Sequence, residues 1–204
     1  MTIIFDKSES IAGDISSGFV ICFTLILAVI SGSLTGSANT NAPSQVLLEQ
    51  SVIYSRQTER CHEQITQLTS DYDRVEKLFN DMHKLQKEFS NPDSGHYVPG
   101  LKSLAISSLD GNWIAWSGNF SAPPVDWFQD WSETNTAVQV YLLEFPAGAE
   151  LLTCTRTSEF LVFSIQQIVK SMLPGQAKAA TLIDSLQQDT GLVVNYTSPF
   201  EDLP

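Results

Sequence analysis

The stretch LKSLAISSLDGNWIAWSG, residues 101–118, decides the fold of this chain. Its two ends, LKSLAISS (101–108) and NWIAWSG (112–118), are rich in apolar and β-branched or aromatic residues. Leu109, Asp110 and Gly111 lie between them, and an Asp-Gly pair flanked by apolar runs is a strong signal for a tight turn. The stretch therefore predicts an antiparallel β-hairpin.

The residues after this hairpin predict more strands, each close in sequence to the next. Three strands are expected at residues 137–145, 149–157 and 159–169, and a further edge strand at 191–197. Short helices are expected at 125–131 and within 177–189, where apolar residues fall at helical spacing. We therefore expect an α+β domain over residues 99–204, with a five- or six-stranded antiparallel sheet and packed helices.

The residues before the hairpin predict one long amphipathic helix over 45–90. No Pro or Gly occurs between Gln45 and Phe89, and Asn91-Pro92 then ends the pattern. Apolar residues follow a heptad repeat, which predicts a narrow apolar seam. This seam either packs on the following domain or pairs with a second copy as a homodimer. Its members are Ile65, Leu68, Tyr72, Val75, Phe79 and Met82, with Phe89 at the end.

The N-terminal region contains GFVICFTLILAVI, residues 18–30, and carries no charge between Asp14 and Glu49. With its flanks this segment approaches the roughly 20 residues that cross a bilayer. We expect a short tail at 1–16, a transmembrane anchor at 17–37 and a flexible linker at 38–44. A cleaved signal peptide and a soluble core helix remain the alternatives. The sparse basic residues slightly favour an exported C-terminal domain.

The hairpin Ser107–Gly118 carries the pattern Asp-Gly, one residue, apolar, apolar, Ala, one residue, Ser. It resembles the first hairpin of Cache and PAS-like extracytoplasmic sensor domains, which also follow a membrane span and a long helix. The resemblance implies a ligand on the concave face of the sheet and signalling through flanking helices. Roadblock and profilin folds have a similar start, so a cytoplasmic roadblock-like adaptor is a further interpretation.

Composition limits the function classes. The formal net charge of −12 argues against nucleic acid as a partner. Cys22, Cys61 and Cys154 are too scattered for a zinc site or a disulfide framework. No nucleophile-elbow, zinc-protease or phosphate-loop motif occurs, so we expect neither catalysis nor a cofactor. Glu59, Cys61, His62 and Glu63 are interpreted as a solvated helix face rather than a metal site.

The candidate binding residues are aromatic, with one arginine. They are Trp113, Trp116, Trp127, Trp131, Tyr141 and Arg156. Aromatic clusters serve either as core or as a ligand surface. Arg156 could hold a carboxylate or could pair with a neighbouring glutamate.

These observations lead to two hypotheses. The first is a non-catalytic, membrane-anchored, extracytoplasmic sensor or ligand-binding domain that signals through its long helix, with a small ligand or a protein as partner. The alternative is a structural subunit of an envelope or secretion assembly, in which the helix and the aromatic surface make protein–protein contacts.

Overall fold

The structure is a computed structural model, and it describes residues 42–71, 75–120, 123, 138–145, 148–170 and 180–194. Within these residues it has three helices and five strands. In chain order the elements are α2 (Ala42–Asp71), α3 (Val75–Phe89), β1 (Leu101–Ser108), β2 (Trp113–Gly118), β3 (Val138–Phe145), β4 (Gly148–Arg156), β5 (Phe160–Lys170) and α5 (Leu182–Thr190).

The strands form one antiparallel sheet in the order β2-β1-β5-β4-β3. The predicted hairpin is present, and its turn is closed by a hydrogen bond from the Gly111 amide to the Ser108 carbonyl. Gly111 has φ 84°, a conformation that glycine adopts without steric cost. The α+β class and the five antiparallel strands are thus confirmed. Residues 191–194 are not a strand, and the rest of that predicted strand lies outside the described residues.

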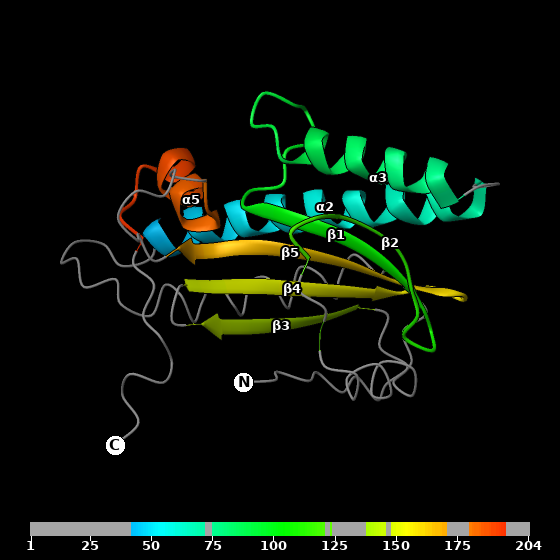
Figure 1. The fold of residues 1–204 in the computed structure, drawn as a ribbon. Coiled ribbons are helices and arrows are strands. Elements are labelled where there is room, and N and C mark those ends of the chain that lie inside the picture. The colour runs from blue at the N-terminus through cyan, green and yellow to red at the C-terminus, as the bar shows by residue number, and fades with distance from the viewer. Residues whose placement is uncertain are drawn as a thin grey trace, which may run out of the picture.

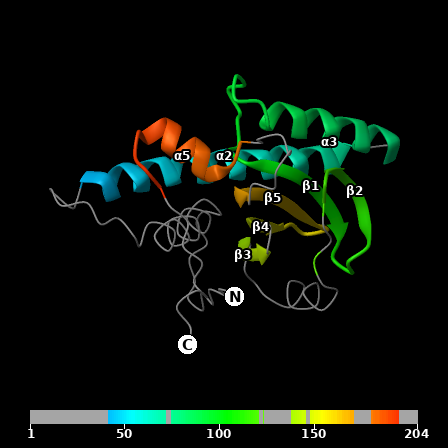
Figure 2. The ribbon, with the colours of Figure 1, turned by 60° about the vertical axis from the view of Figure 1, so that its left-hand side comes forward.

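The three helices lie on one face of the sheet (Figures 1 and 2). α2 crosses the middle of this face and contacts β5, α3 packs over β1 and β2, and α5 packs beside α2. Side chains alternate along each strand, so every strand presents one set to the helices and the other to the opposite face. The sheet therefore has a helix face, which packs on α2, α3 and α5, and an opposite face that carries the other set of side chains.

The prediction of one continuous helix over 45–90 is wrong. The chain instead forms α2, which ends at Asp71, and α3, which begins at Val75 and returns along the same face of the sheet (Figure 1). The physical reason is burial. Ile65 on α2 and Leu78, Met82 and Phe89 on α3 all join one core cluster with the sheet, which a straight helix longer than the domain could not achieve.

The start of this region also differs from the prediction. α2 begins at Ala42, inside the segment expected to be a linker, with Pro43 in its first turn. Proline is tolerated there because the first amides of a helix have no intrahelical acceptor. The predicted anchor at 17–37 lies outside the described residues. None of the described helices is long and apolar enough to cross a membrane.

Candidate functional site

The sheet face opposite the helices carries an aromatic cluster. The ring of Trp113 on β2 lies 4.7 Å from that of Phe120 and 5.3 Å from that of Phe163 on β5. Around them the buried apolar residues of this face are Ala105, Tyr141, Leu152, Cys154, Leu161 and Ile165. Trp113 and Tyr141 of the predicted binding set therefore belong to the same cluster.

Trp116 belongs to a different surface. Its ring lies 5.2 Å from that of Phe79 on α3, in an edge-to-face arrangement, and the residue is 49% exposed. The two tryptophans of β2 are thus separated, since Trp113 packs on the aromatic cluster and Trp116 packs on α3. Trp127 and Trp131 lie outside the described residues.

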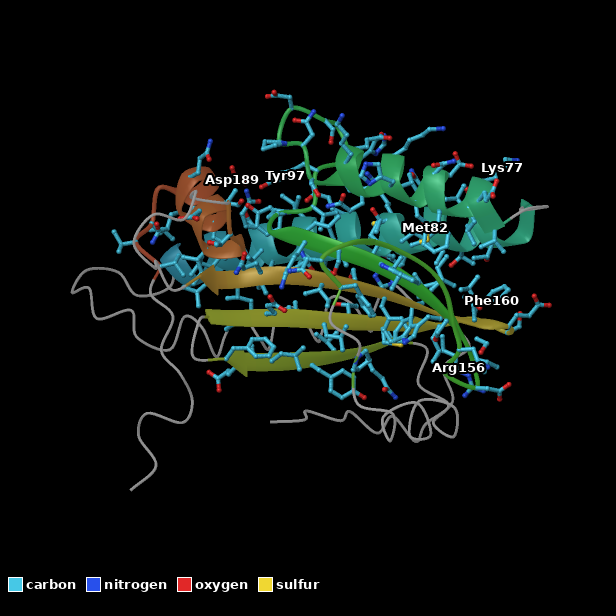
Figure 3. The ribbon with its side chains drawn as sticks, viewed as in Figure 1. Lys77, Met82, Tyr97, Arg156, Phe160 and Asp189 are labelled. Carbon is cyan, nitrogen blue, oxygen red and sulfur yellow. The ribbon has the colours of Figure 1, made fainter. Side chains whose placement is uncertain are left out.

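Tyr141 and Arg156 occupy different environments. Tyr141 is buried, and its hydroxyl donates to Oε1 of Gln139 at 2.6 Å. Arg156 is the last residue of β4 and lies with Phe160 at one end of the sheet, away from Tyr97 and Asp189 (Figure 3). Glu150, on the same strand as Arg156, pairs with Lys102, at 2.5 Å between Nζ and Oε1.

The described members of the candidate seam are divided between α2 and α3. Ile65 and Met82 are fully buried against the sheet, and Leu68 and Phe79 are half-buried around the same cluster. Val75 is exposed, and Tyr72 lies outside the described residues. Most of the described seam thus packs on the chain's own domain.

The helix face contains a polar layer that the sequence analysis missed. His62 on α2 inserts between β4 and β5, with Nδ1 2.7 Å from the Thr155 hydroxyl and Nε2 2.7 Å from the Ser164 hydroxyl. Because one nitrogen of a neutral imidazole donates and the other accepts, a single tautomer satisfies both contacts. Burial lowers the pKa of His62 to about 3, which keeps the ring neutral.

A second group of contacts lies one helical turn earlier. The Thr58 hydroxyl donates to the Tyr54 carbonyl at 3.0 Å and reaches Oε1 of Gln166 at 3.4 Å. Nε2 of Gln166 donates to the Pro99 carbonyl at 3.1 Å. These contacts and those of His62 form the polar layer, which comprises Thr58, His62, Thr155, Ser164 and Gln166.

Two further hydroxyls are buried on the helix and sheet that form this layer. Ser55 Oγ on α2 and Thr153 Oγ1 on β4 have no hydrogen-bond partner among the described residues. An unpaired buried hydroxyl costs about 1–3 kcal/mol relative to a paired one. The middle of α2 is therefore held by polar contacts as well as by apolar packing, and two hydroxyls at this interface are unpaired among the described residues.

The Ser164–His62 contact has the geometry of a nucleophile and its base. Both residues are almost completely buried, at 0% and 2% exposure, so the Ser164 hydroxyl presents no surface to a substrate in this conformation. The arrangement holds α2 on the sheet. Burial also raises the pKa of the Cys61 and Cys154 thiols, which disfavours the reactive thiolate.

The interpretation of residues 59–63 as a solvated helix face is wrong for Cys61 and His62, which are buried. The signal that could have revealed them is a stripe of small polar residues at helical spacing, with Ser51, Ser55, Thr58, His62 and Thr69 on one side of α2. Apolar periodicity alone does not detect such a stripe, because its buried members are four hydroxyl side chains and the His62 imidazole.

No group of His, Cys, Asp and Glu in the described part of the chain is arranged to hold a metal ion. A scan against profiles of known protein families finds no match. A search of curated protein sequences also finds no match.

Proposed function

We propose that this chain is a non-catalytic, membrane-anchored sensor or ligand-binding domain, displayed outside the cytoplasm and similar to Cache and PAS domains. The apolar segment at 17–37 would anchor it. A small ligand or a protein would bind the face of the sheet opposite the helices once that face, which is buried in this conformation, opens. α2 would carry the signal toward the membrane.

The observation that carries the proposal is the alternation of chemistry along β4 and β5. Cys154 and Phe163 face the aromatic cluster, and their chain neighbours Thr155 and Ser164 hydrogen-bond to His62 on α2. Because these neighbours share one backbone, a ligand that shifts β4 or β5 would also shift the hydroxyls that hold α2.

The continuity of α2 supports a role in transmission. It is a 30-residue helix that begins 12 positions after Ile30, the end of the apolar segment. α2 also contacts α3, which packs on the hairpin that bears Trp113. A displacement of the sheet could thus reach the membrane-proximal end of the chain through a single element.

The first test is protease protection of sealed membrane vesicles that contain the full chain, with intact-mass analysis of the protected fragment. Retention of Met1 and an exported domain are expected. A domain on the cytoplasmic side would contradict the sensor and favour the roadblock-like adaptor.

The second test addresses binding. A small-molecule library is screened for compounds that raise the melting temperature of the full chain, since a ligand of the native state must stabilise it. For each hit, hydrogen exchange should change in the α2 amides around His62 as well as on β4 and β5. A compound that raises the melting temperature without changing hydrogen exchange in α2 would contradict transmission through this helix.

The exposed edge of the domain favours a second candidate, a subunit of an envelope or secretion assembly. Trp116 and Val75 are both about half exposed, and Phe79 lies against Trp116 at the edge strand β2. In this case native mass spectrometry should show a constitutive oligomer or complex that Trp116→Ser weakens. A monomer with no bound partner would contradict the assembly subunit.

A further inference from the structure

The surface of α2 changes character at its middle. The first 14 residues, 42–55, contain one charged residue, Glu49, whereas residues 56–71 contain Arg56, Glu59, Arg60, Glu63 and Asp71. A helix in a uniform aqueous environment would be expected to carry charges along its whole exposed side. The two halves of α2 therefore fit different surroundings.

The apolar residues of the first half are not all used by the core. Leu47 and Tyr54 pack in the cluster with α5 and the sheet, but Val46, Leu48 and Ile53 are between 41% and 46% exposed. Val193, which follows α5, is 71% exposed, and its neighbour Val194 packs in the same cluster as Leu47. We refer to Val46, Leu48, Ile53 and Val193 as the apolar end of the domain.

The position of this end relative to the rest of the chain points to its partner. The start of α2 and the segment after α5 lie at the same end of the domain in both views (Figures 1 and 2). Residues 31–41 separate α2 from the apolar segment 18–30, and even fully extended they reach only about 40 Å. An anchored chain would therefore keep the apolar end close to the bilayer at high effective concentration.

We propose that the apolar end rests on the lipid bilayer, with Val46, Leu48, Ile53 and Val193 inserted at the boundary between headgroups and acyl chains. This inference rests on the proposed membrane anchor. The four side chains supply apolar area without a lysine or arginine among them. On the helix, Gln45 and Glu49 lie between Leu48 on one side and Val46 and Ile53 on the other, and Gln45 donates a hydrogen bond to Glu49 at 3.2 Å, which satisfies one oxygen of this carboxylate. The contact is therefore hydrophobic and should not require anionic lipid.

Docking at this end would give α2 a fixed point from which to transmit movement. The helix is about 45 Å long, so its other end, near Val75, would stand well above the bilayer surface. Val75 is 50% exposed and apolar, and it thus provides a matched control at the far end of the same helical pair.

The experiment uses the full chain reconstituted in phosphatidylcholine nanodiscs, in a Cys22→Ser background. A fluorophore is attached through Glu49→Cys, or in a second preparation through Val193→Cys, and bromine-labelled phosphatidylcholine is the quencher. Both labels should lose fluorescence with brominated lipid and resist iodide in the aqueous phase. A label attached through Val75→Cys should show the opposite behaviour.

A patch variant, Leu48→Ser with Ile53→Ser, should abolish lipid quenching of the label at position 49. Val75→Ser is its control and should leave the quenching unchanged. Both changes are at exposed sites, and an unaltered melting temperature would show that the fold is retained. Quenching that appears only with anionic lipid and is removed by salt would overturn the hydrophobic contact.

The outcomes separate the anchor from the docking. If residues 17–37 are protected in the nanodisc but the labels at 49 and 193 are open to iodide, the docking is refuted and the anchor stands. If those labels resist iodide without lipid quenching and the particle contains two copies, a second chain covers the apolar end and the docking is again refuted. If the chain does not insert at all, the anchor and the docking fail together.

Discussion

The stability of the domain should depend on pH through His62. This ring is buried between the Thr155 and Ser164 hydroxyls, and its pKa is lowered from 6.5 to about 3. The unfolded chain then binds a proton near pH 6.5 that the folded chain does not accept until about pH 3. The contribution of His62 is fully present above pH 6.5 and is lost progressively as the pH falls toward 3.

The size of the stability loss follows from the difference between the pKa values of His62 in the unfolded and folded chain. One pKa unit corresponds to about 1.36 kcal/mol, so His62 should lower the free energy of unfolding by about 2 kcal/mol between pH 7 and pH 5. By pH 3 the loss would reach about 4 kcal/mol, a large part of the total stability of a typical domain. Carboxylates also titrate below pH 5, so the effect must be measured as a difference between variants.

The assay is urea unfolding of the full chain followed by tryptophan fluorescence, at half-unit steps from pH 7 to pH 4.5. His62→Gln removes the titrating group and should flatten the pH dependence. At pH 7 it should cost about 1–3 kcal/mol, because an amide cannot reproduce both imidazole contacts. His96→Gln, at a half-exposed site, is the control for the loss of a histidine elsewhere on the chain. Equal pH slopes for wild type and His62→Gln would refute the reasoning.

Three further expectations concern the sheet. Gly118→Ala should lower stability by at least about 1–3 kcal/mol, because φ is 82° and an added Cβ would lie 2.2 Å from a backbone oxygen; a variant as stable as wild type in urea would contradict this. Trp113→Ala should cost up to about 3–5 kcal/mol by the same assay, the upper range being that for a fully buried ring, because its partly buried ring packs on Phe120 and Phe163. Trp116→Ala should cost clearly less because the residue is 49% exposed; equal losses would contradict this difference in burial. Cys61 and Cys154 should react with a maleimide at pH 8 only after unfolding, since both thiols are buried and their pKa values are raised. Label found by mass spectrometry on either residue of the native protein would contradict this.

The strands and turns of this domain could be predicted from local sequence. Asp110-Gly111 sets a turn whose backbone conformation glycine permits, and β-branched and aromatic runs on either side favour extended chain. The boundaries of β1, at 101–108, agree with the predicted ones. These features need only the chemistry of neighbouring residues, which the sequence contains directly.

The break between α2 and α3 could not be predicted in this way. Residues 45–89 contain neither proline nor glycine, and their apolar spacing is compatible with one helix. The sheet decides the outcome, because Ile65 and Met82 can both be buried on it only if the chain reverses. Tertiary burial outweighs the weak local preference for continuing a helix.

The candidate site shows the same division. The sequence by itself determined which aromatic residues fall on strands, and alternation implied that Trp113 and Trp116 would separate. Only the tertiary structure decided that Trp113 joins Phe163 and that His62 meets Thr155 and Ser164. Thr155 and Ser164 are 93 and 102 positions away from His62 in the sequence, and Phe163 is on another strand from Trp113. These residues meet because of the order in which β1, β5 and β4 lie side by side. No local pattern encodes that order, because it follows from the packing of the whole sheet against its helices.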